Sequence, residues 1–220
     1  ITKDLKGVIF TPNVDHLIKL QTDQHFYNLY NKADWVLCDS KIIKIFSKFL
    51  STNIKEVITG SDLFPDYCEQ IASNISYNKR VFILGGTSKN ILKKTINKLH
   101  SFSSHKYVVG GHSPDFGFEN NPKNIKMIID MIKNSKANVL AIGLGAPKQE
   151  KIVYQIINDL PNIELVFAVG ATIDFISGEV KRAPLWMRKF ALEWLYRMLT
   201  NPKRLAKRYL IDDLPIFWLI

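Results

Sequence analysis

Cysteine is scarce in this sequence, and the spacings that bind metals are missing. Its 220 residues include two cysteines, Cys38 and Cys68, which lie far apart and form no Cys-x-x-Cys pair. The five histidines show no metal-ligand spacing, and Asp115 is not part of an Asp-x-Asp pair that could hold a divalent cation against a diphosphate. The sequence therefore predicts no metal and no other cofactor, no disulfide framework, and a reducing, cytoplasmic compartment.

Long apolar runs are also missing. The apolar stretches are strand-sized, and even the segment 210–220 is interrupted by Asp212, Asp213 and Pro215. A membrane-spanning helix needs about 20 mostly apolar residues, so no such helix is expected. The sequence also shows no charged-then-apolar leader, so a secretion signal is not expected. Hydrophobic residues nevertheless make up 46% of the chain, enough for a substantial core in one domain of ordinary size.

Short β-branched or aromatic runs alternate with longer segments of helical periodicity. The runs lie at residues 7–10, 34–38, 80–84, 107–109, 138–142 and 165–169, and helical patterns cover 14–30 and 123–134. Such alternation is typical of a mostly parallel sheet with helices on both faces. The sequence therefore predicts an α/β core over residues 1–180, without a second compact domain.

Acidic residues become rare towards the end of the chain. Between residues 181 and 208 there are nine Lys or Arg and one acid, Glu193, and apolar residues recur at roughly helical spacing. Residues 181–220 are therefore predicted to form a basic amphipathic appendage that docks on a membrane or on the active site. The net charge of +10 indicates an anionic partner, which could be nucleic acid, anionic lipid or a phosphate-bearing substrate.

Polar residues follow the predicted strands, where parallel sheets bind their ligands. Asp39 follows the second apolar run, and a partly buried carboxylate there can act as a general base. Thr11 and Asn13 follow the first strand and can hydrogen-bond a sugar or a ribose. Two alternatives stay open: Asp39 can cap a helix that starts near Lys41, and the Thr-Pro-Asn segment can be an ordinary turn or N-cap.

Further loop residues and the tail extend this candidate site. The two glycines at 85–86 let a nucleotide approach the backbone, although neither G-x-G-x-x-G nor a Walker pattern is present, and Gln149 can both donate and accept hydrogen bonds. If the site transfers a sugar from a nucleotide donor without a metal, cations and helix N-termini must neutralise the diphosphate that leaves. The candidate binding residues are Asn13, Thr59, Gly60, Asp62, Gly85, Gly86, Gly143, Gln149, Gly170, Asp174, Arg197, Arg204, Lys207 and Arg208. Tight turns, helix starts and a solvated basic helix explain many of the same residues.

Several short motifs occur in a distinctive order. They lie at residues 11–13, 39, 59–63, 147–150, 170–178, 182–186, 192–194 and 197. The late segment is the most specific, with Gly-x-x-x-Asp-Phe followed by Arg-Ala-Pro-x-Trp and Leu-Glu-Trp. Taken together, the motifs resemble the WecG/TagA/CpsF glycosyltransferase family over nearly the whole chain.

The resemblance implies a Rossmann-like, peripheral membrane enzyme at the inner face of the cell membrane. It implies transfer of a hexose derivative, often N-acetylmannosamine or its uronate, from a UDP donor to an undecaprenyl-diphosphate-linked sugar. Such enzymes act in the synthesis of wall teichoic acid, enterobacterial common antigen and capsule. By the same resemblance Asp39 is the base and Thr11 its neighbour in the sugar pocket, Gln149 binds the donor, and Arg197 and Arg204 meet the diphosphate when the tail docks.

Three positions depart from the family pattern. Ser40 stands where a glycine commonly follows the aspartate, no arginine precedes Thr59-Gly60, and no tryptophan follows Glu150. The donor and acceptor sugars therefore stay open.

The main alternative is a basic nucleic-acid-binding or membrane-binding protein without transferase activity. A nucleotide-dependent oxidoreductase and a scaffold with a decayed site are two others. The aromatic and aliphatic residues among the cations of the tail favour an anionic membrane over nucleic acid. An apolar tail that is not docked also favours a homo-oligomer.

Overall fold

A single parallel sheet organises the chain. The computed structural model describes residues 5–51 and 53–218, with the side chains of Arg204, Phe217 and Trp218 outside the described part. The strands are β1 (Gly7–Phe10), β2 (Trp35–Val36), β3 (Val81–Gly85), β4 (Val108–His112), β5 (Val139–Gly143) and β6 (Leu165–Ala168). They are ordered β2-β1-β6-β5-β3-β4, and all neighbouring pairs are parallel. The predicted α/β, Rossmann-like fold is confirmed.

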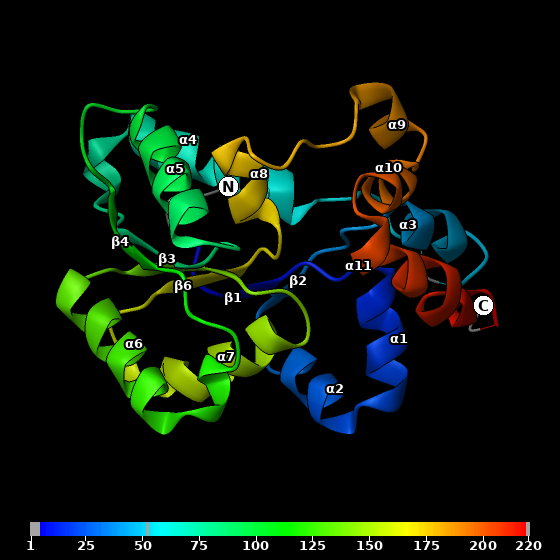
Figure 1. Cartoon of the computed structure of the whole chain (residues 1–220), viewed down its shortest axis with the longest axis horizontal. Coiled ribbons are helices and arrows are strands. Elements are labelled where there is room, and N and C mark those ends of the chain that lie inside the picture. The colour runs from blue at the N-terminus through cyan, green and yellow to red at the C-terminus, as the bar shows by residue number, and fades with distance from the viewer. Residues whose placement is uncertain (1–4, 52, 219–220) are drawn as a thin grey trace.

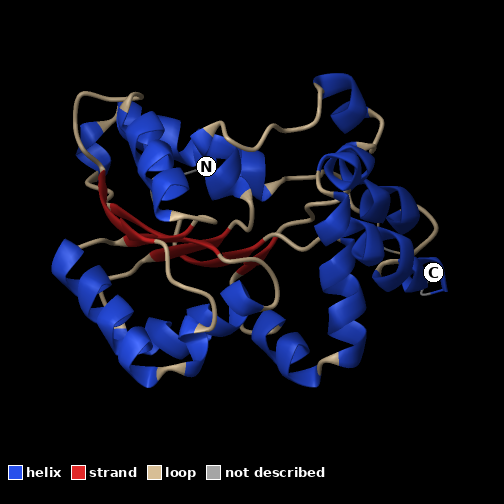
Figure 2. Cartoon of the chain, in the orientation of Figure 1, coloured by secondary structure: helices blue, strands red, loops and turns tan. Residues whose placement is uncertain are grey.

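Helices cover both faces of this sheet (Figures 1 and 2). One face carries α4 (Gly60–Ser73), α5 (Lys89–His100) and α8 (Thr172–Ser177). The other face carries α2 (Gln24–Tyr30), α6 (Pro122–Ser135) and α7 (Lys148–Ile156). The helices α1 (Val14–Thr22) and α3 (Lys41–Ser47) lie at the β2 side, where the C-terminal segment also packs.

Successive strand residues point to opposite sides of the sheet and join two separate hydrophobic clusters. Val8 and Phe10 pack in one cluster with α2, α6 and α7, whereas Ile9 packs in the other with α4 and α5. Because both faces are buried, the strands consist of nearly continuous apolar runs. Both clusters consist of residues up to Ile176, so the described residues of the C-terminal segment contribute to neither.

Three expected elements have different bounds in the structure. The helical pattern 14–30 forms two helices, because the Asp23 side chain accepts a hydrogen bond from the Phe26 N–H, 2.9 Å long, and so starts α2. The expected strand 34–38 is wrong in length: β2 holds only Trp35 and Val36, both exposed at the sheet edge. Strand β4 continues beyond residue 109 through two glycines, which have low β-propensity and so hid its extent.

Residues 181–220 are called the appendage below, and their described part, 181–218, folds back against α1 and α3 (Figure 1). Their elements include α9 (Leu185–Lys189), α10 (Glu193–Thr200) and α11 (Pro202–Lys207), followed by a π-helical turn at Arg208–Asp212. Met187, Leu205 and Ile216 are buried. None of the helices in the described part has both the length and the hydrophobicity that crossing a membrane requires.

Candidate active site

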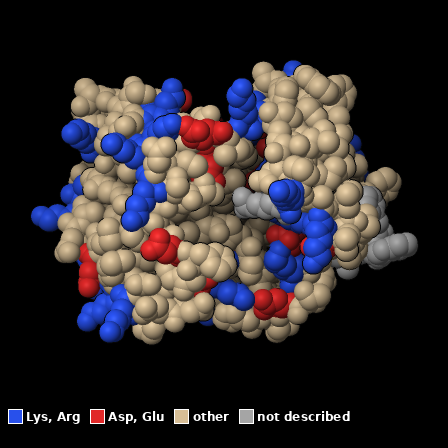
Figure 3. Space-filling model, viewed as in Figure 1, with Lys and Arg blue, Asp and Glu red and all other residues tan. Residues whose placement is uncertain are grey.

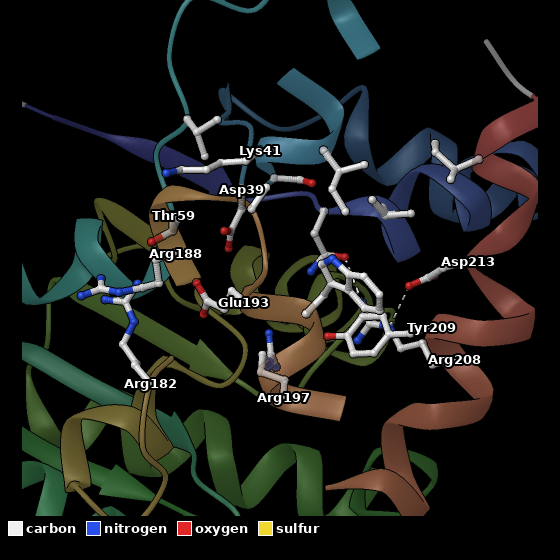
Figure 4. A pocket seen from close by; sticks show the side chains of 18 of the residues that line it. Asp39, Lys41, Thr59, Arg182, Arg188, Glu193, Arg197, Arg208, Tyr209 and Asp213 are labelled. Carbon is white, nitrogen blue, oxygen red and sulfur yellow. Dashed lines mark hydrogen bonds and ion pairs between the residues drawn. The ribbon is translucent and has the colours of Figure 1, made fainter. Parts of the chain in front are cut away.

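A cavity of about 480 Å³ lies between the carboxyl ends of β1 and β2 and the appendage. Figure 3 shows the notch that separates the core from the appendage, with acidic and basic side chains around it. The core contributes Asn13, Asp39, Thr59 and Asp62 to the cavity, and the appendage contributes Arg182, Arg188, Glu193, Arg197 and Arg208 (Figure 4). The appendage and the sheet edge therefore form a partly open, highly charged cavity between them.

Asp39 is partly buried at the wall of this cavity. The Gly60 N–H donates a hydrogen bond of 3.4 Å to Oδ2 of Asp39. Burial raises the pKa of Asp39 to about 7; the Gly60 hydrogen bond and the charge of Arg197 oppose this rise, and the charge of Glu193 supports it. A carboxylate with this pKa is half-ionised near neutral pH and is suited to accept a proton.

The alternative role of Asp39 as the cap of the helix that starts at Lys41 is wrong. Ser40 occupies the N-cap position of α3, and its side chain accepts a hydrogen bond of 3.3 Å from the Ile43 N–H. The Asp39 N–H is bonded to the Pro12 carbonyl at 2.9 Å, which fixes the β2 loop next to the β1 loop. The Asp39 carboxylate therefore does not cap α3; it lines the cavity, with Oδ2 hydrogen-bonded to the Gly60 N–H.

Arginines of the appendage form the basic side of the cavity. Arg182 donates to both carboxylate oxygens of Asp62, at 2.5 and 3.3 Å, and Arg188 lies 3.8 Å from the same carboxylate. The Arg197 guanidinium stacks over Phe175 at 5.7 Å from the ring centroid. These planar guanidinium groups are suited to bind two oxygens of a phosphate at once.

Arg208 holds the end of the appendage on the core. Its Nη2 donates to Oδ1 of Asn13 at 3.0 Å, and its guanidinium lies 3.6 Å from both Asp15 and Asp213. Burial raises the pKa of Asp213 to about 6, and the charge of Arg208 opposes the rise. Lys207, on the preceding turn, points to solvent with a 77% exposed side chain, and the side chain of Arg204 lies outside the described part.

Thr11 and Gln149 lie below the cavity but do not line it. The Thr11 hydroxyl is buried and donates to the Ala168 carbonyl at 3.2 Å. Gln149 is also buried: its Oε1 accepts from the Gly170 N–H at 3.0 Å, and its Nε2 donates to Glu150 at 2.9 Å. In this state both side chains brace the loops after β1, β5 and β6, and their predicted substrate contacts stay predictions.

The predicted residues around β3 and β5 serve close packing in this state. A Cβ on Gly85 would lie 2.4 Å from the Gly143 carbonyl oxygen, so the two strand ends approach closely. Gly86 has a positive φ of 88°, which glycine adopts without strain. Asp174 accepts hydrogen bonds from the N–H and hydroxyl of Thr87, at 3.0 and 3.2 Å, and so ties α8 to the loop after β3. None of these residues lines the cavity beside Asp39.

Replacing Gly143 with alanine is expected to destabilise the fold. The new Cβ would lie 2.4 Å from Cδ1 of Ile173 and 2.6 Å from the Gly170 carbonyl oxygen. Overpacking of this kind costs about 1 to 3 kcal/mol, measurable by urea denaturation. Gly145→Ala is the control, because its Cβ meets open space and only its positive φ of 76° opposes the change. A cost for Gly143→Ala no larger than for the control would contradict the packing role.

The comparisons with known proteins agree with the order of motifs. The description "Glycosyl transferase WecG/TagA/CpsF family" matches residues 1–220. The chain belongs to this family. The resemblance predicted from the sequence is therefore confirmed, and the family is one of glycosyltransferases.

Three curated relatives carry the same name, N-acetylglucosaminyldiphosphoundecaprenol N-acetyl-beta-D-mannosaminyltransferase. The relative from Bacillus subtilis is 25% identical over 93% of this chain and 75% of its own length. The one from Bacillus spizizenii is 28% identical over 89% and 72%, and the one from Staphylococcus aureus is 27% identical over 95% and 77%. The chain is thus similar to enzymes of one named activity along most of its length.

Other members of the site were not predicted from the sequence. Arg182 and Glu193 lie within the late family motifs, so a signal for them was present. Lys41, Arg188 and Tyr209 have no such signal: Lys41 starts α3 in the core, and Arg188 and Tyr209 reach the cavity through the appendage. Among the described residues, no group of three or more His, Cys, Asp and Glu side chains could hold a metal ion.

Proposed function

We propose that this chain transfers an N-acetylmannosamine-type sugar, or another hexose derivative, from a UDP donor to an undecaprenyl-diphosphate-linked sugar. The reaction then belongs to the synthesis of a bacterial surface polysaccharide or teichoic acid. It is an inverting transfer that needs no metal, with Asp39 as the base. Family membership and the activity named for the relatives support the reaction class.

One observation carries the proposal for the site. The partly buried Asp39 carboxylate, with a pKa of about 7, faces a cavity whose other wall is lined by arginines. A transfer between a nucleotide sugar and a hydroxyl needs a base on one side and cations for a diphosphate on the other. This cavity offers both within one space.

The proposed step is a single displacement. Asp39 takes the proton of the acceptor hydroxyl while the oxygen of that hydroxyl attacks the anomeric carbon of the donor sugar. The bond between that carbon and the diphosphate oxygen breaks, and its electron pair leaves with UDP. Arg197 and neighbouring arginines of the appendage balance the charge that develops on the diphosphate. One displacement inverts the configuration at the anomeric carbon.

The outer face of the appendage supports access from a membrane. Phe190 and Leu199 are 73% and 68% exposed and do not line the cavity, and the neighbouring helices are rich in Lys and Arg. Apolar side chains that insert into lipid, together with cations near anionic headgroups, are typical of peripheral membrane proteins. We therefore propose that this face rests on the inner surface of the cell membrane, where the lipid-linked acceptor enters the cavity.

A UDP-release assay tests the proposal. The purified chain is incubated with a panel of UDP-sugars and a short-chain lipid-diphosphate sugar acceptor, with EDTA present. We expect release that depends on the acceptor and is not reduced by EDTA, and reactions without acceptor are the control. Release only after a divalent cation is added would contradict the metal-free mechanism. No release with any pair, together with no UDP binding, would favour the alternative of a basic binding protein.

A further inference from the structure

Two carboxylates from distant parts of the chain face the same space beside the arginines. Asp39 belongs to the loop after β2, whereas Glu193 is the first residue of α10 in the appendage. Both line the cavity, and Figure 4 shows the carboxylate of Glu193 between Asp39 and Arg197. Only docking of the appendage brings this second carboxylate to Asp39.

Without Glu193, the charged side chains that line the cavity with Asp39 would be mostly positive. Asp62 and Asp213 are the other acidic side chains that line the cavity: Arg182 donates to both oxygens of Asp62, and Arg208 lies 3.6 Å from Asp213. Among the described side chains, no cation forms an ion pair with Glu193 at 4.0 Å or less, so none of them neutralises its charge by direct contact. Besides Asp39 and Glu193, the titratable or charged residues that line the cavity are Lys41, Asp62, Arg182, Arg188, Lys189, Arg197, Arg208, Tyr209 and Asp213, and Cys38 directly precedes Asp39.

This arrangement resolves a chemical conflict. Arginines that stabilise a departing diphosphate also stabilise the ionised form of a nearby carboxylate, which makes that carboxylate a weaker base. A second negative charge at the same wall offsets this effect without removing the arginines. Glu193 supports the rise in the pKa of Asp39, which is caused mainly by burial, whereas Arg197 and Arg182 oppose it.

We propose that Glu193 is a positioning residue for the transfer reaction, because its carboxylate faces Asp39 and preserves the basicity of Asp39 among the arginines. The inference rests on the proposed function, since it assigns Asp39 as the base. Glu193 itself contacts neither the proton nor the anomeric carbon. It links docking of the appendage to the strength of the base.

The pH dependence of kcat for Glu193→Gln tests this inference. Glutamine keeps the size of the side chain and removes its charge. We expect the acid limb of the profile to move to lower pH by about 0.5 to 1 unit. The rate on the alkaline plateau should fall about threefold, because a weaker base accepts the proton less readily. Glu193→Asp, which restores the charge, should return the acid limb most of the way to its wild-type position.

Glu179→Gln is the matched control. Glu179 forms an ion pair with Lys94 of α5 and does not line the cavity, so its replacement should leave the profile unchanged. A purely structural role for Glu193 would lower the rate at every pH without moving the acid limb, and this result would overturn the inference. If Glu193→Gln lowered the rate at alkaline pH as far as Asp39→Asn does, Glu193 would itself act as a base, and this result would overturn the inference as well.

A carboxyl NMR titration separates this inference from the proposed function. The Asp39 signal, assigned by its loss in Asp39→Asn, is followed through pH in the wild-type chain and in the Glu193→Gln variant. We expect a lower midpoint in the variant. An unchanged midpoint would overturn the inference whatever the activity. A lower midpoint in a protein that releases no UDP would retain the electrostatic link and reject only the transferase proposal.

Discussion

Replacing Asp39 with asparagine is expected to lower the rate of sugar transfer by about 100- to 10,000-fold, the usual contribution of a general base. Asparagine has nearly the same shape but accepts no proton from the acceptor hydroxyl. UDP-sugar binding should be retained, because the arginines of the cavity are unchanged. The measurements are UDP release with the lipid-linked acceptor and donor binding by calorimetry.

Asp66→Asn is the matched control for this experiment. Asp66 lies exposed on α4, outside the cavity, so the same change of charge there should leave transfer near the wild-type rate. Near-normal activity of Asp39→Asn would show that another group takes the proton. A parallel loss of UDP-sugar binding would instead place Asp39 among the binding residues.

The pH profile of the wild-type chain follows from the same carboxylate. The pKa of Asp39 is raised to about 7 by burial, and only its ionised form acts as a base. The rate should therefore rise with pH through about 7 and then reach a plateau.

The same shift also affects stability. Because Asp39 binds a proton more tightly in the folded than in the unfolded chain, folding stability falls as pH rises from about 4 to 7. Asp39→Asn removes this cost and should raise Tm at pH 8, by about 2 to 4 °C for each kcal/mol gained. A lower Tm would show that the ionised carboxylate supports the fold. A residue that limits stability while serving the reaction is typical of active sites.

Removing the appendage, by ending the chain at Val180, is expected to abolish transfer while leaving a folded core. Both hydrophobic clusters of the described core are complete by Ile176, so the truncated chain should unfold cooperatively. It loses the cavity wall that carries Arg182, Glu193 and Arg197. Circular dichroism and urea denaturation check the core, and UDP release checks activity.

Membrane binding should be lost in the same truncation. The full chain is expected to sediment with anionic vesicles more than with neutral ones, and added salt should weaken this binding. A control is the full chain with Lys123→Gln and Lys126→Gln, which removes two cations from α6, on the opposite side from the appendage. Full transfer activity in the truncated chain would contradict the role of the appendage, as would stronger binding of the full chain to duplex DNA than to vesicles.

Most of the sheet could be predicted from the sequence because its strands are buried on both faces. Runs such as Val81–Gly85 and Leu165–Ala168 are apolar throughout, which is the pattern of a central parallel strand. The edge was less predictable. Trp35 and Val36 resemble a buried run but are exposed, since β2 has a single neighbour, and the glycines of β4 carry no side-chain pattern at all.

Part of the candidate site could be predicted in the same way. Asp39, Asn13 and Thr59 follow strands or start helices at the carboxyl edge of the sheet, and all three line the cavity. Thr11 and Gln149 follow the same rule, yet their side chains bond to the Ala168 carbonyl and the Gly170 N–H in this state. Position at the sheet edge predicts which loops meet, but it does not predict which way each side chain points.

The residue types and their order along the chain determined the fold class, the glycosyltransferase family and the basic, amphipathic character of the tail, because these depend on local patterns. The tertiary structure decided which charges meet. Asp39 acquires its raised pKa through burial, and Glu193, Arg197 and Arg208 reach the cavity only because the appendage folds back over the sheet edge. Electrostatic coupling depends on distance and burial in space, and neither can be read from separation in sequence.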